Sequence, residues 1–245
     1  MKISVIIPTL NEEKTLEKCL QSIKSQKKKP FEIMVVDGES KDKTREIAKK
    51  NGAKVIIEKK KSIAAAKNTG AKISKGDILA FTDADSEVDP AWIERIEKNF
   101  QNKKVVCVGG PVLPKEGNLK DKTLFYLSTN LVPKILSKFG FYAFQGSNQS
   151  FLKSAFLKVG GFSEKLEYLE DNELPNRIKK EGKVIFDPKL KVYTSTRRFK
   201  KEGYLKATVR YLKAYLKIYF LKEKEVKNYP RYRELKDKIE KIKLE

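Results

Sequence analysis

The sequence predicts an α/β domain with a mostly parallel central sheet and helices on its faces. Short apolar runs of strand type alternate with helix-like segments along the first hundred residues. Strands that alternate with helices favour parallel pairing through right-handed crossovers. Polar residues directly follow several strands, at the sheet edge where ligands bind in such folds. The 245 residues, 40% of them hydrophobic, are enough for one such domain with a true core.

The first half of the chain supplies the strands and helices of the sheet in alternation. Residues 3–7 read as the first strand, and Asn11 is expected to cap the helix that follows. The second strand covers residues 31–36, and Ser40 is expected to cap a helix that stops near residues 51–52. The next expected elements are a strand at 54–57, a helix at 62–73, a strand at 78–80, a helix at 92–100 and a strand at 105–108.

The second half alternates less regularly. Residues 119–144 carry many large apolar side chains, which favours a core helix; an apolar lid or acceptor groove is the alternative. Pro175 is tolerable only in the first turn of a helix, so Asp171 or Asn172 should lie at a helix N-terminus, where an N-cap role is also open. A short helix at 154–158 and strands near Val184 and Val192 complete the expected fold.

Residues 203–221 have the spacing of an amphipathic helix with an apolar stripe, a basic stripe and flanking tyrosines. Tyrosine and lysine around an apolar stripe suit a membrane interface. Packing on the protein's own core and a dimer contact are the alternatives. No apolar run approaches the ~20 residues of a membrane-spanning helix and no signal peptide is visible, so we expect a cytoplasmic protein, with peripheral membrane attachment through this helix as an option.

The net charge of the chain indicates which classes of partner the protein attracts. Lys and Arg number 54 against 32 Asp and Glu, a net charge of +22, which attracts nucleotide diphosphates, nucleic acids or anionic membranes. Lysine and glutamate enrichment is also the mark of hyperthermophile proteins. Cys19 and Cys107 lie in apolar runs and are expected to be buried thiols in a reducing cytosol. The chain has no histidine, so a zinc site is not expected, and a general base must be Asp, Glu, Lys or Tyr.

The stretch Phe81–Ser86 follows a buried strand and carries Asp83 and Asp85 one residue apart. Alternate residues of an extended segment point the same way, so both carboxylates can converge on one small volume. A hard cation such as Mg²⁺ or Mn²⁺ relieves their repulsion and is usually shared with substrate phosphates. The stretch therefore predicts a metal and a diphosphate. The alternative is that Asp83 caps a turn, as Asp37 can do before Gly38.

Six segments, in this order, resemble the family 2 glycosyltransferases, which are inverting enzymes of the GT-A fold. They are Ser4–Glu13, Val35–Ser40, Ala66–Gly70, Asp83–Asp85, Gly146–Phe162 and Glu170–Arg177. The resemblance covers roughly residues 1–200. It implies a Rossmann-like domain with a nucleotide-sugar-binding half at 1–112, an acceptor-side half at 113–200 and a basic amphipathic helical tail at 201–245.

The resemblance also implies roles for single residues. Asp171 is expected to be the catalytic base, and Asp85 the ligand of Mg²⁺ or Mn²⁺. The residues expected to bind the nucleotide-sugar are Pro8, Thr9, Asn11, Glu12, Asp37, Lys67, Asp83, Ala84 and Asp85. The residues expected on the acceptor or diphosphate side are Gly146, Ser147, Asn148, Glu170, Arg197 and Arg198. The implied reaction moves one sugar from a nucleoside-diphosphate sugar to a hydroxyl of a lipid-linked or glycan acceptor.

Three departures from the family pattern bear on function. Lys67 stands where arginine is common, so it contributes charge without a bidentate fork. Many relatives place a histidine after the last strands, where this chain offers Arg197 and Arg198. The Gln-x-x-Arg-Trp motif of processive synthases is absent, which favours single-sugar transfer. A polyanion-binding protein or a catalytically silent relative is the alternative, although no nucleic-acid-binding motif is present; a nucleotidyltransferase is disfavoured because no glycine-rich loop follows the first strand.

Overall fold

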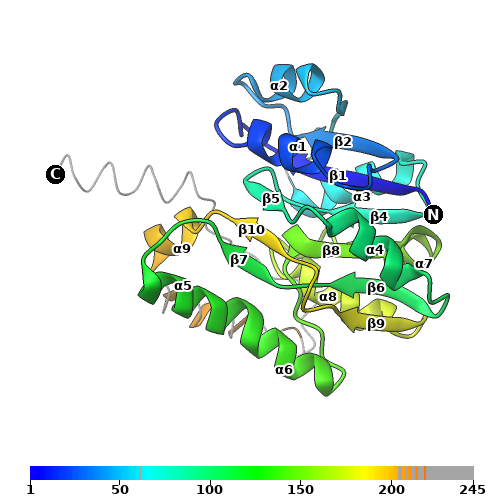
Figure 1. Cartoon of the computed structure of the whole chain (residues 1–245), viewed down its shortest axis with the longest axis vertical. Coiled ribbons are helices and arrows are strands. Elements are labelled where there is room, and N and C mark those ends of the chain that lie inside the picture. Colours follow the sequence, from blue (N-terminus) through cyan, green and yellow to red (C-terminus); the bar gives the residue numbers. More distant parts are fainter. Residues whose placement is uncertain (61, 204–205, 208, 211–212, 215–217, 219–245) are drawn as a thin grey trace.

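The computed structural model describes residues 1–60, 62–203, 206–207, 209–210, 213–214 and 218. A seven-stranded sheet lies at its centre and confirms the predicted α/β class (Figure 1). Its strands, in chain order, are β1 (Ile3–Thr9), β2 (Glu32–Asp37), β3 (Lys54–Ile57), β4 (Ile78–Phe81), β6 (Val105–Gly109), β8 (Gln149–Leu152) and β9 (Lys183–Phe186). Their order across the sheet is β3-β2-β1-β4-β8-β6-β9.

Most neighbouring strands pair in parallel, as predicted, but β8 does not. β1 runs parallel to β2 and β4, and β6 runs parallel to β9. β8 pairs antiparallel with both β4 and β6, so that Gln149 lies in register with Phe81 and Gly109. Because β8 runs the opposite way, it begins at the edge where its parallel neighbours end. The short 3-10 turn η2 (Gly146–Asn148) before β8 is thereby brought to that edge.

Helices cover both faces of this sheet. They are α1 (Leu16–Lys24), α2 (Thr44–Lys50), α3 (Ile63–Ile73), α4 (Trp92–Phe100), α7 (Lys153–Lys158) and α8 (Glu170–Ile178). Alternate residues of β1 face opposite sides, with Val5 and Ile7 among the side chains of α1 and α4, and Ile6 among those of α3, α7 and α8. On the second face, the rings of Phe81, Phe151 and Phe156 lie 5.5 to 5.9 Å apart. Two layers of buried apolar side chains therefore pack against the sheet beneath the site.

A smaller sheet extends the strand ends. It consists of β5 (Ser86–Val88), β10 (Val192–Thr194) and β7 (Val112–Pro114), in the order β5-β10-β7. The hydroxyl of Ser86 donates to that of Thr194 at 2.9 Å, joining the acidic stretch after β4 to the last strand of the fold. Helix α9 (Arg197–Glu202) follows β10, so its first residues lie beside the acidic stretch.

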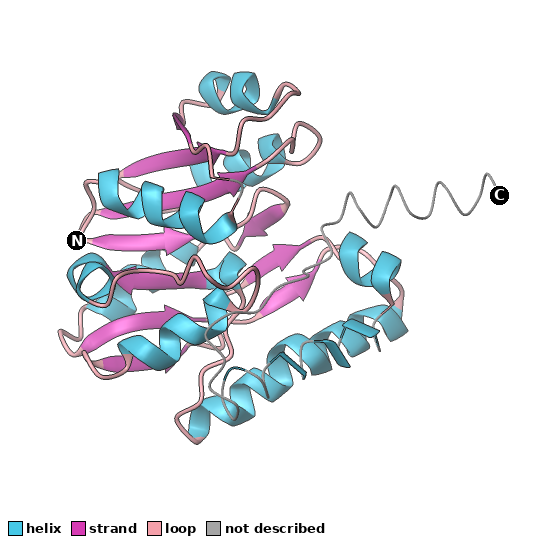
Figure 2. Ribbon diagram, turned by 180° about the vertical axis from the view of Figure 1, so that it is seen from behind, coloured by secondary structure: helices cyan, strands magenta, loops and turns pink. Residues whose placement is uncertain are grey.

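The favoured prediction for residues 119–144, a core helix, is wrong. These residues form α5 (Leu119–Tyr126), a π-helical turn η1 (Leu127–Leu131) and α6 (Val132–Lys138), which make one long rod along the outside of the smaller sheet (Figure 2). Phe125 and Phe144 are buried, but most large apolar side chains of the segment are exposed. Helical spacing of apolar residues predicts an apolar stripe without saying what covers it.

The predicted caps at Asn11 and Ser40 are also wrong. Helix α1 begins at Leu16 and α2 at Thr44, each several residues later than expected. Asn11 has a left-handed backbone with φ of 51°, its N–H donates to the Ser40 hydroxyl, and its side chain accepts from the N–H of Lys41. Both polar side chains tie the loop after β1 to the loop after β2, so neither reaches its own helix.

The described residues of the tail lie against the body of the protein. Ala214 is buried in a small cluster with Leu166 and Leu169. Arg210 forms an ion pair with Glu202, with Nε 2.6 Å from Oε1. The other residues of the predicted 203–221 helix lie outside the described part. In the part of the chain that is described, no helix has the length and apolarity needed to cross a membrane. Cys19 and Cys107 are buried free thiols, as predicted.

Candidate active site

The acidic stretch after β4 is held by an arginine from α9. One Oδ of Asp85 lies 3.2 Å from Nη2 of Arg197, and the other accepts from the hydroxyl of Thr194 at 3.3 Å. The same Nη2 lies 2.8 and 2.9 Å from the two carboxylate oxygens of Glu12. The first loop, the acidic stretch and the start of α9 therefore meet at three predicted site residues, Glu12, Asp85 and Arg197. Arg198 also lies in α9.

The charges of Asp83 and Asp85 both affect the pKa of one buried group, the thiol of Cys19. Burial raises the pKa of the Cys19 thiol, and the charges of Asp85 and Asp83 raise it further. The charge of Asp83 also raises the pKa of Lys67 in α3, so Asp83 lies between the two groups. Carboxylate oxygens suit Mg²⁺ or Mn²⁺, which bind one or two protein carboxylates together with substrate phosphates. Within the described residues no group of three acidic, cysteine or histidine side chains is arranged to hold a metal ion, so a metal here needs oxygens from a ligand. The donor set fits such a shared metal.

Asp37 fixes the loops at the end of β2. Its side chain is fully buried. It accepts from the backbone N–H of Ser40 at 2.8 Å and from the hydroxyls of Ser40 and Thr9, and Nε of Arg45 lies 3.7 Å away. Thr9 is paired with Asp37 across β1 and β2, as Pro8 is with Val36. The side chain of Arg45 is half exposed, so it connects the buried carboxylate of Asp37 to the surface. The sequence did not indicate Arg45 as a site residue.

A buried ion pair joins α3 to α8. Nζ of Lys67 lies 3.1 Å from Oε1 of Glu170, and both side chains are almost completely buried. The ammonium also lies 5.0 Å from the centre of the Phe162 ring. Burial alone would lower the pKa of Lys67, but the charges of Glu170, Asp83 and Asp171 outweigh it and raise that pKa above its usual range. Lys67 therefore stays charged at the centre of the acidic side chains.

Asp171 lies directly after this pair and belongs to the same cluster. One carboxylate oxygen accepts from the N–H of Gly146 at 2.7 Å, and the other from Nδ2 of Asn172 at 2.6 Å. Burial, followed by the charge of Glu170, raises the pKa of Asp171 to about 7, against the opposing effect of Lys67. A carboxylate with that pKa can both release and accept a proton at neutral pH.

The backbone at residues 146 and 169 is matched to this cluster. A Cβ at Gly146 would lie 2.6 Å from Nζ of Lys67 and 3.2 Å from Oδ2 of Asp171. A side chain at position 146 would therefore displace the ammonium of Lys67 from its present place. Leu169 precedes α8 with a left-handed backbone (φ of 66°), although its side chain is buried. A left-handed leucine is uncommon and is held by its surroundings.

Pro175 lies inside α8 and not in its first turn, contrary to expectation. A proline has no N–H, so the carbonyl of Asp171, four residues earlier, loses its helical partner. The Nε2 of Gln149 donates to that carbonyl at 2.6 Å. The first residue of β8 thereby replaces the missing hydrogen bond and fixes the backbone of Asp171. Sequence inspection missed Gln149; the proline was the signal that another donor is needed.

Three predicted site residues, Ala84, Ser147 and Asn148, are buried within the fold. Ala84 is buried in the core cluster of α1 and α4. The amide of Asn148 is fully buried and bonds to the indole of Trp92 at 2.9 Å and to the carbonyls of Pro111 and Leu190. In this structure these side chains hold the rim in place, while Glu12, Asp85, Asp171 and Arg197 keep part of their surface open.

A parallel sheet with acidic loops at its carboxyl edge, a smaller sheet beyond them and an antiparallel β8 defines a GT-A glycosyltransferase fold. The sequence profile of Glycosyl transferase family 2 matches residues 4–160, and the chain belongs to that family. The predicted family and fold are therefore confirmed. Glycosyltransferase AglE of Haloferax volcanii is 39% identical over 118 residues, which are 45% of this chain and 39% of AglE.

Two further comparisons extend over more of the chain. The glucosyl-dolichyl phosphate glucuronosyltransferase of Haloferax volcanii is 29% identical over 178 residues, covering 66% of this chain and 56% of that protein. The solved structure of mannosyltransferase PcManGT from Pyrobaculum calidifontis, in complex with GDP-Man and Mn²⁺, has a TM-score of 0.63 at 18% identity and covers 97% of this chain and 68% of that one. The chain spans less than two thirds of the length of both curated relatives.

Proposed function

We propose that this protein transfers one sugar from a nucleoside-diphosphate sugar to an acceptor hydroxyl and inverts the anomeric carbon. The observation that carries the proposal is Asp171, a carboxylate with a pKa of about 7 that shares its cluster with Lys67 and Glu170. In this proposal residues 1–112 hold the donor and residues 113–200 face the acceptor.

Asp171 acts as the general base. It accepts the proton of the acceptor hydroxyl while that oxygen attacks the anomeric carbon and the bond to the diphosphate breaks. The hydrogen bonds from Gly146 and Asn172 hold its carboxylate in position during the attack. Direct displacement needs no nucleophilic side chain and inverts the sugar configuration. Lys67 stays charged beneath the base and keeps the repulsion between Glu170 and Asp171 in check.

The departing diphosphate needs positive charge. Asp85, with Asp83 beside it, would hold Mg²⁺ or Mn²⁺, whose chemistry is to neutralise charge on the leaving phosphates. Arg197 lies 3.2 Å from Asp85 and is close enough to move its guanidinium onto the phosphates. Support for a metal comes from the carboxylate donors at this edge and from the Mn²⁺ bound by PcManGT. Thr9, Asn11 and Asp37 would shape the nucleoside end of the site.

For the acceptor, we propose a lipid-linked molecule, which would place the protein peripherally on the cytoplasmic face of a membrane. The name of the similar glucuronosyltransferase specifies a dolichyl phosphate-linked sugar as its acceptor. The net charge of +22 favours an anionic surface of this kind. A glycan acceptor without a lipid is the alternative that a transfer assay would reveal.

Thermal unfolding with UDP and GDP, each with and without Mn²⁺, tests the donor side of the proposal. A ligand that binds only the folded state raises its stability. We expect one nucleotide to raise the melting temperature, and Mn²⁺ to enlarge that shift. A folded sample that responds to neither nucleotide contradicts the proposal and points to a silent relative. Stabilisation by DNA alone, weakened by salt, would instead indicate a general polyanion binder.

A further inference from the structure

The rod formed by α5, η1 and α6 presents an unusual apolar surface. Among the described residues, eight of the fifteen exposed large hydrophobic side chains belong to the rod or to the loop directly after it. They are Leu119, Leu124, Tyr126, Leu127, Leu131, Ile135, Phe139 and Phe141. Phe139 is 74% exposed and Ile135 47% exposed, so this surface is uncovered by the described parts of the fold. Apolar side chains gathered in this way mark an interaction site.

Lysines accompany these side chains along the rod. Residues 119–141 contain Lys120, Lys122, Lys134 and Lys138 but only one acidic residue, Asp121. No ion pair within the described part of the chain involves any of the four lysines. Exposed lysines interspersed with exposed apolar side chains fit a partner that has an anionic surface and a hydrocarbon interior.

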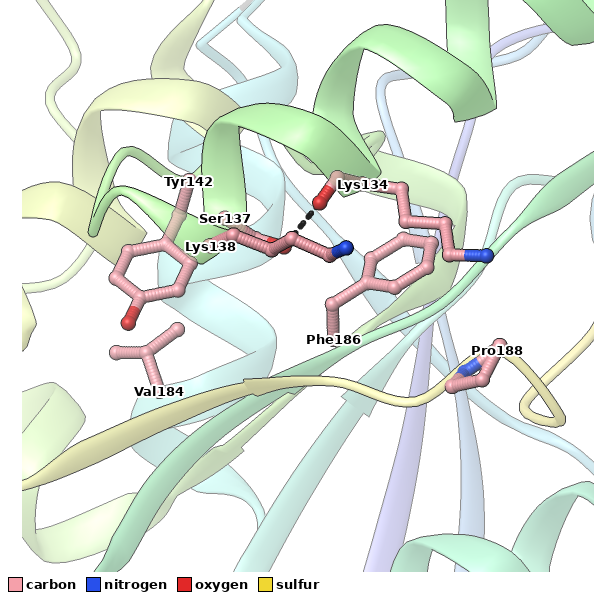
Figure 3. A pocket seen from close by; sticks show the side chains of 7 residues that line it. All are labelled: Lys134, Ser137, Lys138, Tyr142, Val184, Phe186 and Pro188. Atoms are coloured by element: carbon pink, nitrogen blue, oxygen red, sulfur yellow. Dashed lines mark hydrogen bonds between the residues drawn. The ribbon is translucent and has the colours of Figure 1, made fainter.

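A hollow beside α6 adds a place for a phosphate. It measures about 220 Å³ and lies between α6 and β9 (Figure 3). Lys134 and Lys138 line it with the hydroxyl-bearing Ser137 and Tyr142, while Phe186 forms part of its apolar wall. The Ser137 hydroxyl donates to the carbonyl of Lys134, so the two ammonium groups beside the apolar wall are the groups available to a phosphate that is attached to a lipid.

We propose that the rod docks on the surface of a bilayer that contains anionic phospholipids. Its apolar side chains, among them Leu127, Leu131 and Ile135, enter the boundary between headgroups and acyl chains. Lys134 and Lys138 bind lipid phosphates at the hollow. A protein partner is less suited, because the apolar side chains lie along one extended rod and the charges beside them are almost all of one sign.

The docking surface is connected to the proposed base. Tyr142 lines the hollow, and its backbone N–H and carbonyl bond to the side chain of Asn176 in α8 at 3.0 and 2.7 Å. Four residues after Tyr142, the N–H of Gly146 bonds to Asp171. A bilayer on the rod would therefore lie one short loop away from the base. This position suits the lipid-linked acceptor of the proposed function. Only this link to the acceptor rests on the proposed function; the docking surface itself does not.

Vesicle sedimentation with the full chain tests the docking surface without donor or acceptor. We expect binding to vesicles of phosphatidylcholine with phosphatidylglycerol, and weak binding to phosphatidylcholine alone. Ile135→Glu, or Lys134→Glu with Lys138→Glu, should each reduce binding by about tenfold or more. The matched controls are Leu157→Glu, an equally exposed residue on α7, and Lys49→Glu with Lys50→Glu on α2, and both should bind as wild type. Undiminished binding by the rod variants overturns the proposal.

A single thiol gives a second readout that does not depend on the variant's affinity. Cys19 and Cys107 are fully buried, so Ile135→Cys adds an accessible thiol for a polarity-sensitive fluorophore. We expect its emission to shift to the blue when anionic vesicles are added, and the same label at Leu157→Cys to stay unchanged. Equal shifts at both positions, or none at residue 135, contradict insertion of the rod. Because neither assay involves sugar transfer, a failure here is distinct from a failure of the proposed enzyme activity.

Discussion

Nζ of Lys67 lies 3.1 Å from Oε1 of Glu170, inside the protein and one residue before Asp171. The pair places one positive charge among three carboxylates, those of Glu170, Asp171 and Asp83. Without that charge, the repulsion between the neighbouring carboxylates of Glu170 and Asp171 would be unopposed. Burial and the charge of Glu170 raise the pKa of Asp171, and the charge of Lys67 limits that rise.

Replacing Lys67 should destabilise the protein, because the buried charge of Glu170 then has no partner. Lys67→Met leaves Glu170 without its partner, and we expect the free energy of unfolding to fall by about 3–5 kcal/mol. Chemical denaturation of both proteins at pH 7 measures this loss. Lys60→Met is the matched control, because Lys60 forms a comparable 2.9 Å pair with Glu164 on the surface. The control should unfold nearly as wild type; equal losses in the two variants would refute a special role for the buried pair.

Asp171→Asn should separate donor binding from transfer. The amide keeps the size of the side chain but cannot accept a proton, so we expect sugar transfer to fall by roughly 10²–10⁴-fold. The nucleotide-dependent rise in melting temperature should remain. Glu94→Gln, at an exposed carboxylate on α4, serves as a control with unchanged transfer. If Asp171→Asn transfers sugar at nearly the wild-type rate, the base lies elsewhere.

The stability of the protein should depend on pH in the way that the raised pKa of Asp171 predicts. Its pKa is about 7 in the folded protein, whereas an unfolded aspartate titrates near 4, about its ordinary value. Between these pKa values the folded state binds the proton more tightly, so this group's contribution to the free energy of unfolding falls as pH rises toward 7. Asn at this position does not titrate. We expect the melting temperature of Asp171→Asn to rise relative to that of the wild type as the pH increases from 5 to 8. A difference between the two melting temperatures that does not change with pH contradicts the raised pKa.

Asp85→Asn should remove the metal-dependent part of nucleotide binding. The neutral amide is a poorer ligand for Mg²⁺ or Mn²⁺ than a carboxylate. We therefore expect the melting temperature with nucleotide to be the same with Mn²⁺ as with a chelator. The wild type and Glu94→Gln should lose their additional shift only when the chelator is present. A full Mn²⁺ effect in Asp85→Asn would exclude Asp85 as the ligand.

Much of the central sheet could be predicted from the sequence, because its apolar runs are short and bounded by clear turn residues. The antiparallel direction of β8 could not, since Gln149–Leu152 reads the same in either direction. The caps at Asn11 and Ser40 failed because each side chain has a tertiary partner in the neighbouring loop. Local sequence shows that a polar side chain can cap a helix, but not that a nearer partner exists.

Motifs in the sequence pointed to a set of candidate site residues but not to the network that links them. The spacing argument for Asp83 and Asp85 assumed an extended segment, whereas residues 84–85 form a turn in which the N–H of Ser86 bonds to the carbonyl of Asp83. The links within the site come from distant residues, such as Arg197 on Asp85 and Gln149 on the carbonyl of Asp171. Such contacts depend on how β8 and α9 return to the sheet edge. Exposure of the rod was likewise unpredictable, because an apolar stripe looks the same whether a core or a membrane covers it.

Leu169, the left-handed residue before α8, is covered by Ala214 and Ile218 of the tail. A backbone in that region persists only while its surroundings hold it. The tail thus packs against the residue that precedes α8, the helix that carries Asp171. A chain shortened before Ala214 would let Leu169 relax and would turn the start of α8 away from Gly146. Loss of transfer on truncation would then report a misaligned base, and say nothing of where the protein resides.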